Sequence, residues 1–130
     1  MKQIHKIGAI ILSNKRILVG KKKDKFIIPG GRIEGEESHE ECLKRELKEE
    51  FNVEMLSHQY FGTFEDAAEF EPNTKIIIDA YLVSVMGKPK ASGEIEEALY
   101  VNSKNKSNVK LGSILEKFVI PELEKRGLIE

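Results

Sequence analysis

The sequence has a single cysteine and no long apolar run, and each of these absences excludes a class of protein. Cys42 is the only cysteine among 130 residues, so an internal disulfide cannot form. A lone thiol is typical of a reducing compartment. The apolar run at residues 7–12 is too short to span a bilayer, and the start of the chain lacks the long apolar region and cleavage site of a signal peptide. We therefore expect a cytoplasmic protein.

The sequence also lacks an excess of charge of either sign. Its 21 basic and 22 acidic residues give a formal net charge of −1. A protein that binds nucleic acid or an anionic membrane usually carries a basic face, and this composition does not require one. The sequence has no internal repeat and no linker, and 130 residues with 40% hydrophobic content are enough for a packed core. We expect one domain over residues 1–130, with no nucleic-acid or membrane partner.

What the sequence does contain is an alternation of β-rich and helical segments. Residues 4–12 and 16–20 are apolar and flank the turn signal Ser13-Asn14-Lys15, which predicts an antiparallel hairpin. Further strands are expected at residues 26–28, 53–64, 74–86 and 97–101. Apolar residues recur at helical spacing from about residue 110 to 126, with Pro121 either dividing this helix or starting a second helical turn. This order predicts an α/β sandwich with a mixed sheet.

The best-marked segment is residues 29–53, a glycine-rich turn followed by a helix. Ser38 and Glu41 have the spacing of a capping box, in which each side chain accepts a hydrogen bond from the other residue's backbone N–H. An apolar stripe along the helix is formed by Leu43, Leu47 and Phe51. Asn52 falls where a helix commonly ends with a left-handed residue. We expect the helix to begin just after Ser38 and to end before Asn52.

The second half of this helix concentrates negative charge. Glu46, Glu49 and Glu50 fall within an arc of about 100°. Like charges at this spacing are destabilising, so a cation is expected nearby, and a set of carboxylates suits Mg²⁺ or Mn²⁺ rather than zinc. Mg²⁺ usually binds one or two carboxylates together with substrate phosphates, which indicates a phosphorylated substrate. The alternative is a solvated acidic face, because glutamate is a good helix former.

The spacing of this segment resembles the Nudix box, G-x5-E-x7-R-E-U-x-E-E-x-G-U, in which U is aliphatic. The matching positions are Gly31, Glu37, Arg45, Glu46, Leu47, Glu49, Glu50 and Val53. Chance agreement at the one glycine, one arginine and four glutamates is on the order of 10⁻⁶ per starting position. One position departs, because Asn52 stands where the family has its second glycine. Asparagine tolerates a positive φ, so we expect the helix end to form and the site to stay intact.

The resemblance implies an α/β/α sandwich with a mixed β-sheet between helices, and a hydrolase of the small MutT-like type. Such enzymes use a divalent metal to cleave a nucleoside diphosphate linked to another group X. Mg²⁺ is the expected cofactor, with Mn²⁺ as the alternative. The expected substrate is a nucleoside triphosphate with a normal or oxidised base, cleaved to a nucleoside monophosphate and pyrophosphate. The expected assembly is a monomer or a homodimer.

The resemblance also assigns roles to individual residues. The cluster that binds metal and contains the general base would consist of Glu46, Glu49 and Glu50, with no choice made among the three. The carbonyl of Gly30 would be a further metal ligand. Arg45, counted with the catalytic residues, would reach back to Glu37 and orient the glutamates. Glu37 and Gly31 would be structural supports.

Residues outside the box are expected to complete the site. The family often takes another carboxylate ligand from the loop before the last strand, where Glu94 is the first choice and Glu97 the second; for each, the alternative is a solvated loop glutamate. Lys22 and Arg32 are predicted to bind the substrate. The lysines at residues 21–23 could reach phosphates as point charges, or could form an exposed and soluble hairpin end.

Two other functions are kept as alternatives. The first is a pyrophosphatase for ADP-ribose or another nucleotide sugar. Family members of that type often carry a proline fifteen positions beyond the box, which here is Ala68, with Pro72 four positions further on; a tyrosine typical of diadenosine-polyphosphate enzymes would fall at Glu69. These absences favour a nucleoside triphosphate. The second alternative is a module that binds nucleotides without cleaving them, although such modules commonly have a damaged box.

Overall fold

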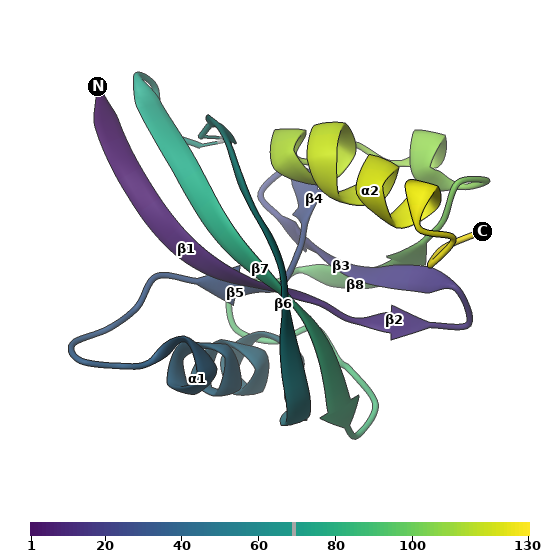
Figure 1. The fold of residues 1–130 in the computed structure, drawn as a ribbon, viewed down its shortest axis with the longest axis horizontal. Coiled ribbons are helices and arrows are strands. Elements are labelled where there is room, and N and C mark those ends of the chain that lie inside the picture. The colour runs from purple at the N-terminus through teal and green to yellow at the C-terminus, as the bar shows by residue number, and fades with distance from the viewer. Residues whose placement is uncertain (69) are drawn as a thin grey trace.

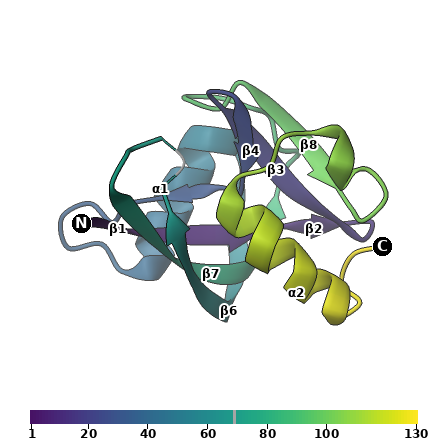
Figure 2. The ribbon, with the colours of Figure 1, turned by 90° about the horizontal axis from the view of Figure 1, so that it is seen from above.

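The computed structural model describes residues 1–68 and 70–130 and contains two sheets with helices on both sides (Figures 1 and 2). The larger sheet has the strand order β5-β1-β7-β6. Its strands are β1 (Lys2–Ile10), β5 (Gly30–Gly31), β6 (Glu54–Ala67) and β7 (Thr74–Met86). β1 and β7 run parallel, whereas β5 and β6 pair antiparallel to their neighbours. The predicted mixed sheet is therefore confirmed.

The smaller sheet is built around β3 (Arg16–Lys22). One edge of β3 pairs with β2 (Leu12–Ser13) and β4 (Lys25–Ile27), and the other edge pairs with β8 (Glu97–Val101). All four strands lie where the sequence predicts β structure, and all of these pairings are antiparallel.

The predicted hairpin of residues 4–12 with residues 16–20 is wrong for most of its length. Its turn forms at Asn14 and Lys15, which have φ values of 52° and 57°, and joins the two-residue β2 to β3. Residues 2–10 instead pair in parallel with β7 in the larger sheet. The physical reason is that this segment buries side chains on both faces, which suits an interior strand covered on both sides better than a hairpin strand.

Helix α1 (His39–Phe51) contacts β1, β5 and β6 and covers one face of the larger sheet. Its capping box is formed as predicted: the Glu41 N–H donates to Ser38 Oγ at 3.1 Å, and the Ser38 N–H donates to Glu41 Oε1 at 2.9 Å. The predicted apolar stripe is fully buried. Asn52 ends the helix in the left-handed conformation, with φ 53° and ψ 41°.

The C-terminal helical segment lies on the side of the molecule opposite α1 (Figure 1). After the short 3₁₀ helix η1 (Lys106–Asn108), it consists of a π-helical turn, η2 (Leu115–Val119), continued by α2 (Ile120–Lys125). Pro121 lies in the first turn of α2, so it starts a second helical segment, as one of the two predictions for it stated. Proline has no N–H and clashes with the carbonyl four residues earlier, and the wider turn that precedes it accommodates both effects. No described helix is long and apolar enough to cross a membrane.

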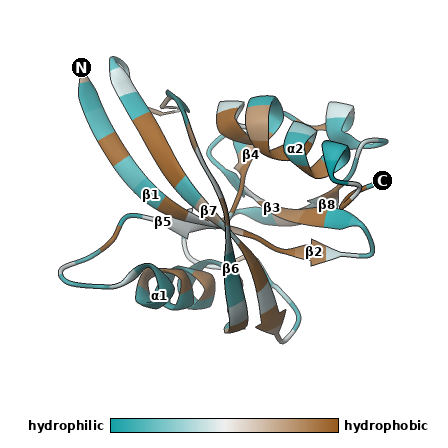
Figure 3. Ribbon diagram, viewed as in Figure 1, coloured by the Kyte–Doolittle hydropathy of each residue, from teal (hydrophilic) through white to brown (hydrophobic). Residues whose placement is uncertain are grey.

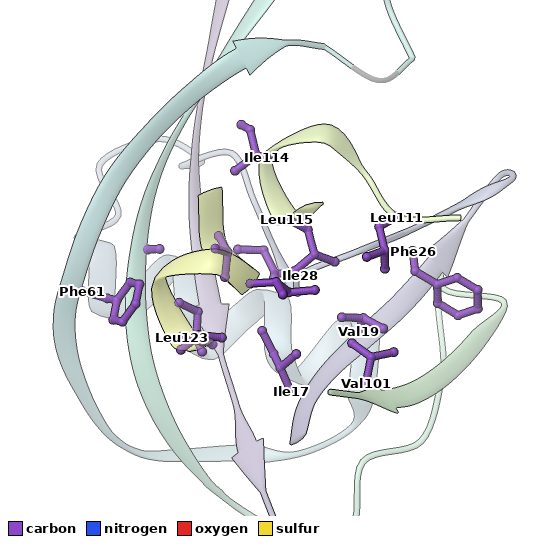
Figure 4. Packing of buried hydrophobic residues seen from close by; sticks show 14 of the residues in the cluster. Ile17, Val19, Phe26, Ile28, Phe61, Val101, Leu111, Ile114, Leu115 and Leu123 are labelled. Atoms are coloured by element: carbon purple, nitrogen blue, oxygen red, sulfur yellow. The ribbon is translucent and has the colours of Figure 1, made fainter. Parts of the chain in front are cut away.

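Two hydrophobic clusters fill the space between the sheets and the helices. In the cluster shown in Figure 4, Leu123 of α2 lies near Phe61 of β6, and Leu115 of η2 lies near Ile28. The second cluster joins α1 to the other face of the larger sheet. Figure 3 shows the apolar segments of the strands running through the centre of the molecule. At about 1.5–3 kcal/mol for each large side chain that is fully buried, the second cluster holds α1 firmly against the sheet.

Candidate active site

A cleft of about 650 Å³ opens beside α1 and the Gly30-Gly31 turn. It brings together residues from β1, β5, β7 and α1, from the end of β3, and from the segments that precede β7 and β8. The predicted site residues that line it are Lys22, Gly30, Gly31, Arg32, Arg45, Glu46, Glu49, Glu50 and Glu94. Glu37 and Glu97 do not line the cleft. Glu37 contacts Arg45, and Glu97 of β8 lies opposite Lys21 of β3.

Gly30 and Gly31 of β5 each lack room for a Cβ, but different atoms occupy that room. Gly30 has a φ of +144°, and a Cβ there would lie 2.1 Å from the Ile7 carbonyl oxygen. A Cβ on Gly31 would lie 2.2 Å from Glu46 Oε1. Gly30 also donates its N–H to Glu50 Oε1 at 2.9 Å. The turn therefore packs tightly against β1 and leaves space for two carboxylates of α1.

Arg45 connects carboxylates of the cleft lining with Glu37, which lies outside it. It donates to both oxygens of Glu37, from Nε at 2.7 Å and from Nη2 at 3.0 Å. Its Nη1 donates to Glu46 Oε1 at 2.8 Å and lies 3.5 Å from Glu49 Oε2, and its Nη2 donates to the Arg32 carbonyl at 2.9 Å. The guanidinium lowers the pKa of Glu37, and these carboxylates raise the pKa of Arg45. Arg45 therefore stays charged and holds Glu46 in one orientation.

The three clustered glutamates differ strongly in their environment. Burial raises the pKa of Glu50 to about 8, against the opposing effect of the Gly30 N–H. Burial also raises the pKa of Glu46, although Arg45 opposes the shift. The Glu49 side chain is 58% exposed. Near neutral pH, Glu50 therefore keeps its proton unless a cation takes the place of that proton.

The residues of the cleft fit a hard divalent cation. Its described lining contains carboxylates and backbone oxygens but no histidine or cysteine, which suits Mg²⁺ or Mn²⁺. In the part of the chain that the structure describes, no three acidic, histidine or cysteine side chains already form a metal-binding group. Mg²⁺ usually takes several of its ligands from water and substrate phosphates. The half-buried carboxylate of Glu50 and the space that Gly31 leaves over Glu46 are the features that fit an ion.

Several cations line the same cleft. Lys22 Nζ lies 3.0 Å from Glu94 Oε2, and this contact lowers the pKa of Glu94, whose side chain is 77% exposed. Arg32 Nη2 lies 3.5 Å from Glu71 Oε1. The predicted ligand Glu94 and the predicted substrate-binding Lys22 therefore pair with each other at the rim of the cleft.

Sequence reasoning missed Lys6 and Phe70, which also line the cleft. A smaller, mostly apolar pocket of about 60 Å³ adjoins it, and the lining residues that the two share include Lys6, Phe70 and Ile76. The available signal was a lysine directly before the apolar run at residues 7–12. Phe70 had no comparable signal, because only the return of the chain from β6 brings it to the cleft. Glu69, considered above for substrate class, lies outside the described residues.

Cys42 lies behind the cleft and is fully buried. Its thiol donates weakly to the carbonyls of Gly31 and Arg32, at sulfur–oxygen distances of 3.6 and 3.5 Å. Burial raises the pKa of the thiol to about 11. Cys42 is therefore a packing residue and not a nucleophile.

Comparisons with known proteins agree with this fold. Residues 3–106 match the family model described as NUDIX domain. A MutT protein from Methanosarcina mazei Go1 has a TM-score of 0.80 at 20% identity, over 97% of this chain and 96% of that chain. A MutT structure from work on Aliivibrio salmonicida and Vibrio cholerae has a TM-score of 0.76 at 24% identity, over 96% and 99% of the two chains. A search of curated protein sequences found no match.

Proposed function

The chain belongs to the Nudix family of pyrophosphohydrolases, which act on a nucleoside diphosphate linked to a group X, and on this premise we propose that its substrate is a nucleoside triphosphate and its metal Mg²⁺. The products would be a nucleoside monophosphate and pyrophosphate. The observation that carries the proposal is the cleft itself, in which three glutamates of one helix face cations from other segments. Such a site can neutralise both a metal ion and a polyphosphate chain.

Glu46, Glu49 and Glu50 would hold the ion together with the Gly30 carbonyl, and Glu94 would add a ligand at the rim. A bound Mg²⁺ would stabilise the charge that develops on the pyrophosphate oxygens. Arg45 keeps the Glu46 carboxylate in place, so that this ligand need not reorganise when the substrate arrives. Any of the three glutamates that is deprotonated and free of the ion can serve as the general base.

Lys22 and Arg32 would bind the outer phosphates as positive charges at the rim of the cleft. Both are already paired with carboxylates, Lys22 with Glu94 and Arg32 with Glu71, so a substrate would exchange one anionic partner for another. The cleft volume of about 650 Å³ lies within the range of sites that enclose one small ligand. Ala68, in the position where nucleotide-sugar enzymes often carry proline, supports a triphosphate as the substrate.

The experiment that tests the substrate class is a turnover panel with purified protein and Mg²⁺. The panel contains the common and oxidised nucleoside triphosphates, ADP-ribose and several nucleotide sugars. We expect the highest kcat/KM for a nucleoside triphosphate. A clear preference for ADP-ribose would show that the substrate is not a nucleoside triphosphate, but would still support pyrophosphate hydrolysis. Tight nucleotide binding in calorimetry without any turnover would indicate a binding module.

Glu50→Gln tests whether this cleft performs the reaction. The change should lower kcat at least about a hundredfold with the fold intact, because glutamine is neutral and a weaker metal ligand than carboxylate. Glu54→Gln, at the exposed start of β6, is the matched control and should keep wild-type activity. A Glu50→Gln variant with nearly full activity would remove Glu50 from the site.

A further inference from the structure

Lys6 is a half-buried cation that has no partner within residues 1–68 and 70–130. It lies on β1 between the buried residues Ile4 and Ile7, and its side chain lines both the cleft and the adjoining apolar pocket. Lys6 makes no hydrogen bond or ion pair with any residue in the ranges 1–68 and 70–130. A charge removed from water without a partner is destabilising, so its position calls for an anion that binds there.

The other cations of the cleft each have a partner. They are Lys22, Lys23, Arg32 and Arg45. Three of them contact carboxylates, and Lys23 Nζ lies 4.8 Å from the centre of the Phe70 ring. A phosphate that binds Lys22, Arg32 or Arg45 must compete with a carboxylate of the protein. Among the residues that the structure describes, no carboxylate is paired with Lys6, so a phosphate there displaces none of them.

The surroundings of Lys6 also explain why it has not paired with the nearby acids. The charges of Glu46 and Glu50 act on it, while burial and the charges of Lys22 and Arg32 lower its pKa. The Glu50 carboxylate accepts from the Gly30 N–H, and Glu46 accepts from Arg45. Both carboxylates therefore bind other groups, and the ammonium group of Lys6 is available to a ligand.

The location of Lys6 indicates which phosphate it would meet. Lys6 stands where the acidic cleft joins the apolar pocket, and that pocket is lined by Ile76, Ile78, Ile114 and Leu115 among others. A nucleotide that lies across this junction would place its apolar nucleoside end toward the pocket and its outer phosphates toward α1. The phosphate at the junction is then the one attached to the nucleoside.

We propose that Lys6 is a substrate-binding residue that holds the phosphate attached to the nucleoside and thereby sets the direction in which the nucleotide lies in the cleft. This inference rests on the proposed function, because it assumes a nucleotide substrate. Lys6→Met keeps most of the apolar stem and removes the charge, and Lys6→Arg keeps a charge. Lys75→Met, on the neighbouring strand β7 and outside both cavities, is the matched control.

The test is calorimetric binding of nucleoside monophosphates, carried out without metal so that it does not depend on turnover. Lys6→Met should weaken the binding of the monophosphate by about tenfold or more, since a hydrogen bond between charged groups is lost. Lys6→Arg should restore most of the affinity, and Lys75→Met should match the wild type. Lys6→Met should melt at the same temperature as the wild type or higher, because it removes an unpaired charge.

Two outcomes would overturn this role for Lys6. One is equal monophosphate affinity in the wild type and in folded Lys6→Met, and the other is the absence of monophosphate binding by the wild type. The proposed function is judged separately, by wild-type turnover in the substrate panel. Turnover with no effect of Lys6→Met would reject Lys6 alone, whereas a Lys6 effect without turnover would reject the catalytic proposal alone.

Discussion

At the scale of single residues, the cleft is controlled by groups that prevent its carboxylates from behaving alike. Glu50 is half-buried and accepts one backbone N–H, Glu46 is held by Arg45, and Glu49 is exposed. These differences separate their proton affinities, and three groups of one type can then take different roles. The spacing of the glutamates was readable from the sequence because helical periodicity places them together. Their burial was not, since it depends on how the Gly30-Gly31 turn packs against α1.

The two adjacent glycines allow a prediction that separates stability from activity. Gly30→Ala places a Cβ 2.1 Å from the Ile7 carbonyl, which belongs to fixed backbone, and should lower the melting temperature by several degrees. Gly31→Ala instead meets the movable end of Glu46 at 2.2 Å. It should fold with nearly wild-type stability but lose at least about tenfold in kcat, since small displacements of catalytic groups are costly. Thermal unfolding and steady-state kinetics of both variants check this, and a Gly31→Ala enzyme with full activity would contradict it.

At the scale of secondary-structure elements, α1 is a well-terminated platform for the site. Ser38 and Glu41 close its first turn, and Asn52 ends it with a positive φ. These features were predictable because caps depend on residues close in sequence. The pairing of β1 with β7 was not predictable in this way, because it joins segments about seventy residues apart. Lys6 was missed for the same reason, since its place in the cleft follows from that pairing.

Asn52 provides a prediction for this element. Asn52→Gly should keep or slightly raise the free energy of unfolding, because glycine adopts a positive φ without strain. Asn52→Ala should lower it by about 1 kcal/mol, since a Cβ is disfavoured in the left-handed region. Denaturant unfolding of both variants checks this order. If Asn52→Ala proved as stable as Asn52→Gly, the left-handed helix end would have no energetic role.

At the scale of the whole molecule, the sandwich holds a titratable acid where it is useful for function and unfavourable for stability. Glu50 has its pKa raised to about 8 by burial, from an ordinary value of 4.5. Between these values the folded protein keeps a proton that the unfolded chain has lost. The metal-free protein should therefore lose stability as pH rises from about 4.5 to 8. A divalent ion that replaces the proton would offset this loss.

Thermal unfolding from pH 5 to 9 in the presence of a chelator tests this linkage. Glu50→Gln should melt higher than the wild type by a margin that widens up to about pH 8, because glutamine carries no charge to desolvate. Adding Mg²⁺ should narrow the margin at high pH by stabilising the wild type. Glu54→Gln, at an exposed position, serves as the control and should show no widening margin. A margin for Glu50→Gln that does not change with pH would contradict the raised pKa.

The central claim is that the carboxylates of α1 support metal-dependent cleavage of a nucleotide pyrophosphate bond. Its most direct test is product analysis by ³¹P NMR, with the best substrate of the panel, with and without Mg²⁺. Nucleoside monophosphate and pyrophosphate should form in equal amounts with Mg²⁺, with no turnover in its absence and at least about a hundredfold less with Glu50→Gln. Release of nucleoside diphosphate and inorganic phosphate, or equal rates with and without the ion, would contradict the account.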